Sequence, residues 1–102
     1  PKNTPSPKQE CGWVALHDDE AVGWNSLIFE SYDTIKFANA FVEEEYRGKG
    51  IYRMLWDERW KYCEENFKGW KVISYCLPTT LQFYKDKGFI EKYTSTLVES
   101  TI

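Results

Sequence analysis

The fold is decided by FVEEEYRGKGIY, residues 41–52 of the chain. An apolar run typical of a β-strand, residues 35–42, leads into it, and an amphipathic pattern typical of an α-helix, residues 51–67, follows it. Gly48 and Gly50 stand between the two and lack a Cβ atom, so the backbone there can adopt positive φ and approach a ligand closely. Because the first N–H groups of a helix have no intrahelical partner and carry partial positive charge, this succession predicts a phosphate-binding cradle.

Two cations, Arg47 and Lys49, add full positive charge beside the glycines. The stretch matches neither of the two commonest phosphate loops. No Lys-Ser or Lys-Thr pair follows the glycines, as a Walker loop requires, and the glycine spacing differs from the dinucleotide fingerprint. We interpret the stretch as a pyrophosphate site, and a basic glycine turn on the protein surface is the alternative.

Length and composition limit the classes of protein to consider. The 102 residues are enough for one domain, and a hydrophobic fraction of 42% with 18% aromatic residues favours a folded globule. Three of the four prolines fall within residues 1–10, which predicts a flexible arm followed by a single domain at residues 11–102. The net charge of −3 implies no broad basic face, so we expect no nucleic-acid partner.

The cysteines, Cys11, Cys63 and Cys76, form no CxxC pair and are odd in number. Structural thiols in a reducing cytoplasm fit this pattern better than a disulfide framework or a zinc site, so we predict a cytoplasmic protein without a metal. No apolar run reaches the roughly 20 residues that span a membrane, and no signal peptide is recognisable. We therefore expect no membrane partner.

The order of the elements predicts an α/β (α+β) fold with one mixed sheet. Alternating segments at residues 13–16, 21–29 and 35–42 indicate three antiparallel strands. In the third, Ile35, Phe37, Asn39 and Phe41 are expected on one face. A β-branched strand at 72–76 follows the helix, which makes a βαβ unit with parallel strands. Pro78 opens a second helix, and a last strand from residue 89 to about 98 is expected to complete the sheet.

The helix at residues 51–67 carries an aromatic stripe at three- and four-residue steps. Charged residues of alternating sign occupy its other side. The stripe is interpreted as core packing and not as a cofactor site, because this periodicity is what a packed helix needs. Its members are Tyr52, Trp56, Trp60, Cys63 and Phe67.

Two motifs in this order resemble the GNAT superfamily of N-acetyltransferases. RGKGI at residues 47–51 is similar to the family's (Arg/Gln)-x-x-Gly-x-(Gly/Ala) cradle, and FYKDKGF at residues 83–89 is similar to its Tyr-x-x-x-Gly-Phe signature. The resemblance implies the family's splayed parallel strands and acetyl-CoA as cosubstrate. It also implies direct transfer of the acetyl group to a small-molecule or protein primary amine within a ternary complex.

The resemblance also implies roles for individual residues. Pyrophosphate is expected on the N–H groups of Gly48, Lys49, Gly50, Ile51 and Tyr52, with Arg47 beside them. The pantetheine arm is expected along Ala40, Phe41 and Val42, where a strand N–H would stabilise the oxyanion. Tyr84 would contact the cofactor and protonate the departing thiolate, and Glu43, Glu44 or Glu45 would act as base. The alternatives are a solvated acidic loop and a tyrosine that only packs.

The sequence departs from the family pattern in three places. Tyr52 stands where the cradle usually has a small residue, and Leu77-Pro78 stands where an Asn often precedes the second helix. The strand and two helices that usually precede the first hairpin are not recognisable, and this segment commonly shapes the acceptor pocket. The alternative function is therefore a degenerate, non-catalytic acyl-CoA-binding or interaction domain. A sheet without its usual first strand exposes an edge, so we also expect a homodimer.

Overall fold

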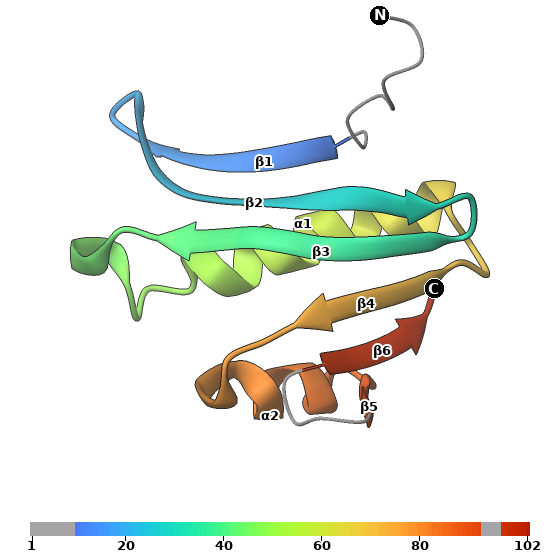
Figure 1. Cartoon of the computed structure of the whole chain (residues 1–102). Coiled ribbons are helices and arrows are strands. Elements are labelled where there is room, and N and C mark those ends of the chain that lie inside the picture. The colour runs from blue at the N-terminus through green and yellow to red at the C-terminus, as the bar shows by residue number, and fades with distance from the viewer. Residues whose placement is uncertain (1–9, 93–96) are drawn as a thin grey trace, which may run out of the picture.

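The computed structural model describes residues 10–92 and 97–102. These residues form one six-stranded sheet and two α-helices, and a single 3₁₀ turn joins the third strand to the first α-helix (Figure 1). Apart from Glu10, with which the first strand begins, the predicted arm lies outside the described residues. The elements are β1 (Glu10–His17), β2 (Glu20–Ser31), β3 (Thr34–Val42), η1 (Glu44–Tyr46), α1 (Ile51–Asn66), β4 (Lys71–Tyr75), α2 (Pro78–Asp86), β5 (Ile90–Lys92) and β6 (Leu97–Thr101).

The sheet has the strand order β1-β2-β3-β4-β6-β5. β3 and β4 are parallel, and every other neighbouring pair is antiparallel. This confirms the predicted mixed sheet, in which hairpin strands precede a βαβ unit. Asp18 and Asp19 form the β1–β2 turn with φ values of 51° and 69°, and positive φ at both central residues matches the natural twist of a two-residue hairpin.

The C-terminal part of the sheet differs from the prediction of one strand from residue 89 to about 98. The structure has two strands there, β5 and β6, which pair antiparallel, and β6 lies between β4 and β5. The N–H of Phe89 donates to the Tyr84 carbonyl and closes α2. The chain must then reverse before Val98 can pair with Ser74 on β4, and alternation along the sequence does not reveal such a reversal.

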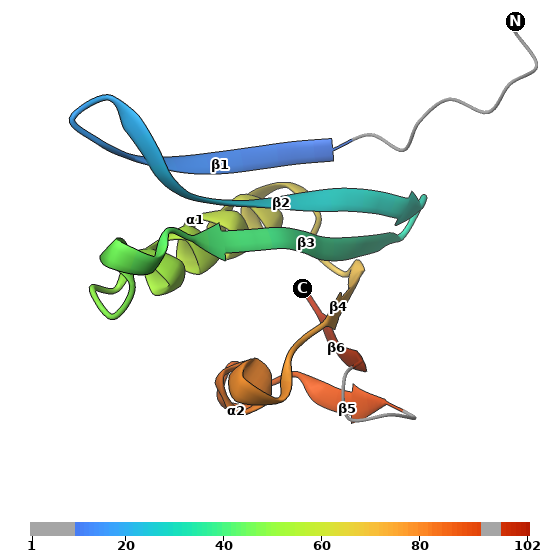
Figure 2. The ribbon, with the colours of Figure 1, turned by 60° about the vertical axis from the view of Figure 1, so that its left-hand side comes forward.

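The core lies between the sheet and α1, which crosses β2 and β3 on one face (Figures 1 and 2). Trp56 and Cys63 of α1 are buried, and Trp56 meets the ring of Phe37 edge-on with 5.8 Å between centroids. α2 adds Tyr84, whose ring lies 6.0 Å from Trp56. The other members of the predicted stripe pack against the same cluster, which confirms that the stripe is core packing; these are Tyr52, Trp60 and Phe67.

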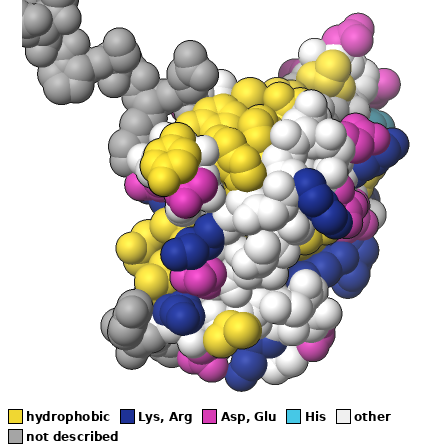
Figure 3. Space-filling view, turned by 90° about the vertical axis from the view of Figure 1, so that its right-hand side faces the viewer, with side chains coloured by type: hydrophobic (Ala, Val, Ile, Leu, Met, Phe, Trp, Pro, Cys, Tyr) yellow, Lys and Arg dark blue, Asp and Glu magenta, His cyan; other side chains and the backbone are white. Residues whose placement is uncertain are grey.

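Basic and acidic side chains are interspersed on the face that Figure 3 shows. Ion pairs of this kind join Lys36 to Glu30 at 3.8 Å and Lys71 to Glu99 at 3.9 Å. Neither helix within the described ranges has the length and apolar composition needed to cross a membrane. Over the same residues, no group of three or more His, Cys, Asp or Glu side chains is arranged to hold a metal ion.

Two leucines allow the contribution of this core to be measured. Leu27 on β2 is fully buried in the main cluster, whereas Leu16 on β1 is 64% exposed. We expect Leu27→Ala to lower the free energy of unfolding by about 2–5 kcal/mol, because it removes buried methyl groups and leaves a cavity. Leu16→Ala is the matched control and should change it by less than about 0.5 kcal/mol. Urea unfolding of both variants measures the difference, and equal effects would contradict this placement of the core.

Candidate functional site

A β-bulge in β3 shapes the site. The register of β2 and β3 shifts by one residue here, since Trp24 pairs with Phe41 but Ser26 pairs with Ala38. Two residues of β3, Asn39 and Ala40, therefore lie opposite the single residue Asn25 of β2. Asn39 adopts a φ of 55°, which accommodates the extra residue. Its Nδ2 donates to Glu10 Oε2 and to Ser26 Oγ, both at 3.1 Å.

The bulge overturns the predicted alternation of β3. Ile35 and Phe37 are buried against α1 as expected, but Phe41 is 39% exposed and Val42 is buried in its place. One extra residue moves every following side chain to the opposite face, since the side chains of a strand alternate with a period of two. Phe41 instead packs on Trp24, with ring centroids 5.0 Å apart.

Beyond the bulge, β3 separates from β4. Their parallel pairing runs from Thr34 with Lys71 to Phe37 with Ser74, and it ends there. Residues 38–42 therefore have no pairing with β4, and the two strands diverge toward their carboxyl ends (Figure 1). Two cavities occupy this divergence, and their walls share Ala40, Tyr52 and Leu77.

The larger cavity, which we call the cradle cavity, has a volume of about 510 Å³ and lies between the end of β3 and the start of α1. Gly48 and Gly50 have φ values of 78° and 85° there, and no atom lies within 4 Å of where their Cβ atoms would stand. Gly50 precedes α1 without any side-chain cap, so the first-turn N–H groups remain available. Eight of the predicted cofactor-binding residues line this cavity: Ala40, Phe41, Val42, Arg47, Gly48, Gly50, Ile51 and Tyr52.

Arg47 folds back onto the strand that precedes it. Its Nε donates to the Val42 carbonyl at 2.7 Å, and its guanidinium carbon lies 5.4 Å from the centroid of the Phe41 ring. The side chain therefore holds the end of β3 and also presents positive charge to the cradle cavity. Lys49 is exposed and lies outside the cavity wall.

Four residues of the cradle cavity were not predicted from the sequence: Tyr46, Arg53, Leu77 and Phe83. Arg53 stands three residues after Gly50, so helical spacing alone places it on the same face of α1 as the glycine turn. Its guanidinium lies 5.4 Å from the ring centroid of Phe83 on α2. The position of Phe83 depends on how α2 packs, which no local pattern indicates.

The smaller cavity, which we call the splay cavity, has a volume of about 300 Å³ and lies where β3 leaves β4. Tyr84 lines this cavity and not the cradle cavity, and it is only 3% exposed. Its hydroxyl oxygen accepts a hydrogen bond from Ser74 Oγ at 3.0 Å. Tyr52 lies at the junction of the two cavities, where burial, with a further contribution from Tyr84, raises the pKa of its hydroxyl.

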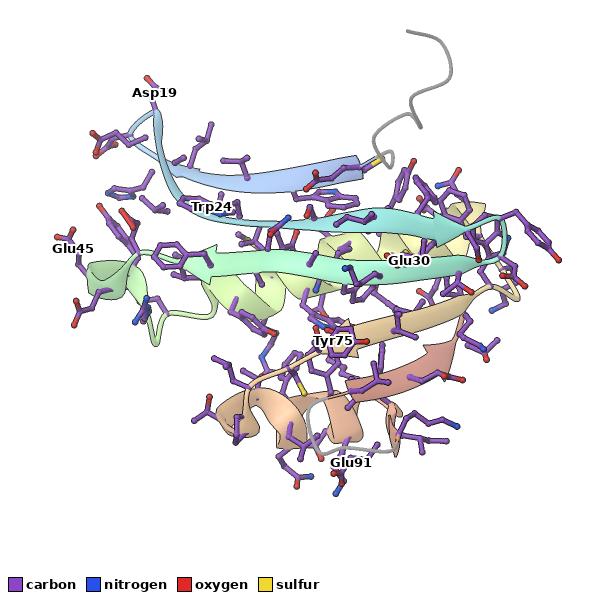
Figure 4. The ribbon with its side chains drawn as sticks, in the orientation of Figure 1. Asp19, Trp24, Glu30, Glu45, Tyr75 and Glu91 are labelled. Carbon is purple, nitrogen blue, oxygen red and sulfur yellow. The ribbon has the colours of Figure 1, made fainter. Side chains whose placement is uncertain are left out.

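The predicted bases lie elsewhere. Glu43, Glu44 and Glu45 line a separate surface depression and neither of the two cavities. The N–H of Glu43 donates to the Val22 carbonyl at 2.8 Å, which fixes the start of η1 beside β2. Figure 4 shows Glu45 at the outer end of η1, whereas Tyr75 lies at the end of β4. The structure thus does not bring these carboxylates together with Tyr84.

The family model of the acetyltransferase (GNAT) domain matches residues 8–91 of this chain. The chain belongs to the GNAT acetyltransferase family. No curated protein matches its sequence.

Solved structures share the fold of this GNAT domain. A GNAT-family acetyltransferase from Staphylococcus aureus is 20% identical with a TM-score of 0.75, and the match covers 92% of this chain and 69% of that one. The PaiA N-acetyltransferase from Thermoplasma acidophilum, solved with coenzyme A, is 18% identical with a TM-score of 0.74, and the match covers 91% of this chain and 61% of that one. The GNAT N-acetyltransferase YhbS from Escherichia coli, also solved with CoA, is 21% identical with a TM-score of 0.69, and the match covers 88% of this chain and 57% of that one. The chain thus spans between 57% and 69% of the length of these proteins.

The bulge of this GNAT domain can be tested by its backbone requirement. We expect Asn39→Ala to be less stable than Asn39→Gly by about 1 kcal/mol, because both lose the side-chain hydrogen bonds but only Ala places a Cβ at positive φ. At the adjacent Ala38, which has no positive φ, the order should reverse, so that Ala38→Gly costs about 0.5–1 kcal/mol. Thermal unfolding of the three variants measures these differences. An Asn39→Ala variant that is more stable than Asn39→Gly would contradict the bulge.

Proposed function

We propose that this GNAT domain binds acetyl-CoA in the cradle cavity and transfers the acetyl group to a primary amine by direct attack in a ternary complex. The observation that carries this proposal is that the two cavities adjoin and share the wall residues Ala40, Tyr52 and Leu77. The glycine turn at the start of α1 opens onto the unpaired edge of β3, and that edge leads to the cavity lined by Tyr84.

The pyrophosphate of the cosubstrate would lie on the N–H groups of residues 48–52. Positive φ at both glycines turns this backbone toward the cavity, and the dipole of the 16-residue α1 adds partial positive charge. Arg47 and Arg53 line the same cavity and supply full charges, while Lys49 contributes from its exposed position. Backbone N–H groups and the two guanidinium groups would therefore share the contacts to the pyrophosphate.

The pantetheine arm carries amide groups that can pair like an additional strand with the edge of β3 at residues 40–42. This edge has no partner in β4. An N–H of Phe41 or Val42 would then donate to the thioester carbonyl oxygen and stabilise the negative charge that develops on it.

The chemical step needs three proton transfers. A lysine-like amine with a pKa of about 10.4 must lose its proton before attack, at a cost of roughly 4–5 kcal/mol at pH 7. Its nitrogen then forms a bond to the thioester carbon and gives up a second proton, which would pass through water to the same base, and the carbon–sulfur bond breaks. The departing thiolate would take the hydroxyl proton of Tyr84, which Tyr84 can donate because it accepts its hydrogen bond from Ser74.

Glu43 and Glu44 remain the proposed bases, and Glu45 shares their position. Since they line a depression separate from both cavities, they would receive the proton of the amine through water. This separation is also the observation that favours the second candidate function, a non-catalytic acyl-CoA-binding or interaction domain.

We also propose that the protein forms a homodimer and is cytoplasmic. The exposed side chains of Val14 and Leu16 on the edge strand β1 support a homodimer. The three free cysteines support a cytoplasmic location.

The cradle can be tested by filling it. Gly50 and Gly69 both have positive φ and open space where a Cβ would stand, but only Gly50 lines the cradle cavity. We expect Gly50→Glu to weaken acetyl-CoA binding by at least about tenfold, because a carboxylate would occupy the anion site. Gly69→Glu is the matched control for backbone strain and should leave the affinity within about twofold. Isothermal titration calorimetry measures both, and equal affinities would argue against this cradle.

The role of Tyr84 can be tested by removing its hydroxyl. We expect Tyr84→Phe to lower kcat by about 10²–10⁴-fold, because the leaving thiolate loses its acid, with little change in acetyl-CoA affinity. Tyr32→Phe, at a tyrosine that is 87% exposed, is the control. Thiol release with a panel of primary amines measures the rate. Tight acetyl-CoA binding without turnover on any amine would favour the non-catalytic candidate.

A further inference from the structure

Arg59 of α1 is a charged side chain buried in the core. It is 1% exposed, and its guanidinium carbon lies 3.8 Å from the centroid of the Phe37 ring. Its Nη1 donates to the Ser26 carbonyl at 2.9 Å. Removing a charge from water is costly unless it is paired, so a buried arginine without an ionic partner requires an explanation.

The other edge of this guanidinium has no ionic partner among the described residues. Nε and Nη2 are buried and make no direct hydrogen bond there, and the Tyr84 hydroxyl is the polar group that interacts with the guanidinium. These two atoms lie on one side of the planar group, and their N–H bonds form the fork that binds both oxygens of a carboxylate. Arg59 thus uses one nitrogen to hold β2, and its buried carboxylate-binding edge has no carboxylate partner among the residues that line the cavity.

This arginine contributes to the wall of the splay cavity. Polar groups surround the same cavity, among them the side chains of Asn39, Ser74, Tyr52 and Tyr84, and none of the described residues that line it is acidic. Burial lowers the pKa of Arg59, and the nearby Tyr84 and Tyr52 hydroxyls oppose that shift. Arginine stays protonated in proteins, so the cavity contains one uncompensated positive charge.

We propose that the splay cavity binds the terminal carboxylate of a dicarboxylic acyl group carried by CoA, with Arg59 as its partner. The inference rests on the proposed function and extends the donor from acetyl to acyl groups such as succinyl. The cavity adjoins the cradle cavity and shares Ala40, Tyr52 and Leu77 with it, so an acyl group on a thiol bound along β3 would point toward it. Its volume of about 300 Å³ suits a small group.

The donor preference can be measured on the unmodified chain without any acceptor. Succinyl-CoA and butyryl-CoA carry acyl chains of equal length that differ in the terminal carboxylate or methyl group. We expect succinyl-CoA to bind at least about tenfold more tightly by isothermal titration calorimetry, because only its carboxylate can pair with the guanidinium. Equal affinities, or tighter binding of butyryl-CoA, would overturn the inference. Since this comparison uses the unmodified protein, it does not depend on whether a variant folds.

Variants assign the preference to Arg59. Arg59→Met removes the charge and should bring the affinity ratio of succinyl-CoA to butyryl-CoA close to one, with acetyl-CoA binding within about twofold of the unmodified chain. Arg59→Lys keeps the charge without the fork and should give an intermediate ratio. Arg53→Met on the same helix is the matched control, which should weaken all three thioesters and leave the ratio unchanged. A preference that survives Arg59→Met would overturn the assignment.

The outcomes separate this inference from the proposed function. If acetyl-CoA and butyryl-CoA bind but succinyl-CoA binds no better, the cradle stands and the carboxylate site is wrong. If none of the three thioesters binds, both proposals are wrong.

Discussion

β3 stays paired with β2 along its length but leaves β4 after Phe37, and the site depends on this divergence. The bulge at Asn39 adds one residue to β3, turns Phe41 outward and leaves the edge at residues 40–42 without a strand partner. A regular β3 could continue its ladder along β4, and the two backbones would then close the space that both cavities occupy. The glycine turn and Tyr84 would remain, but the adjoining cavities between them would be lost.

Much of this arrangement follows from local sequence. Gly48 and Gly50 between an apolar strand and an amphipathic helix permitted a turn with positive φ, and both glycines adopt it. The aromatic stripe of α1 fixed the face that the helix buries. A strand, a helix and a second strand in succession predicted parallel pairing, because a helical crossover returns the chain to the end of the sheet where the first strand began. These features depend on residues a few positions apart.

The rest depends on contacts between distant residues. Alternation along residues 35–42 gives no sign of the bulge, which Asn39 supports through Ser26 and Glu10 on other strands. A cation within a helix of alternating charges is expected in solvent, yet Arg59 is buried because its partner is a carbonyl 33 residues away. The reversal between β5 and β6 follows from Val98 reaching β4. Sequence spacing predicts none of these pairings.

The uncapped start of α1 has a consequence for how this domain diverges. If main-chain amides bind the pyrophosphate, as proposed, most neighbouring side chains can be replaced without loss of a donor. Only the glycines with positive φ are then constrained. The fold itself is shared at TM-scores of 0.69 to 0.75 by proteins only 18–21% identical to this chain. In the proposed binding mode, replacement of Lys49 or Ile51 would change a side chain beside the pyrophosphate and leave the main-chain donors in place.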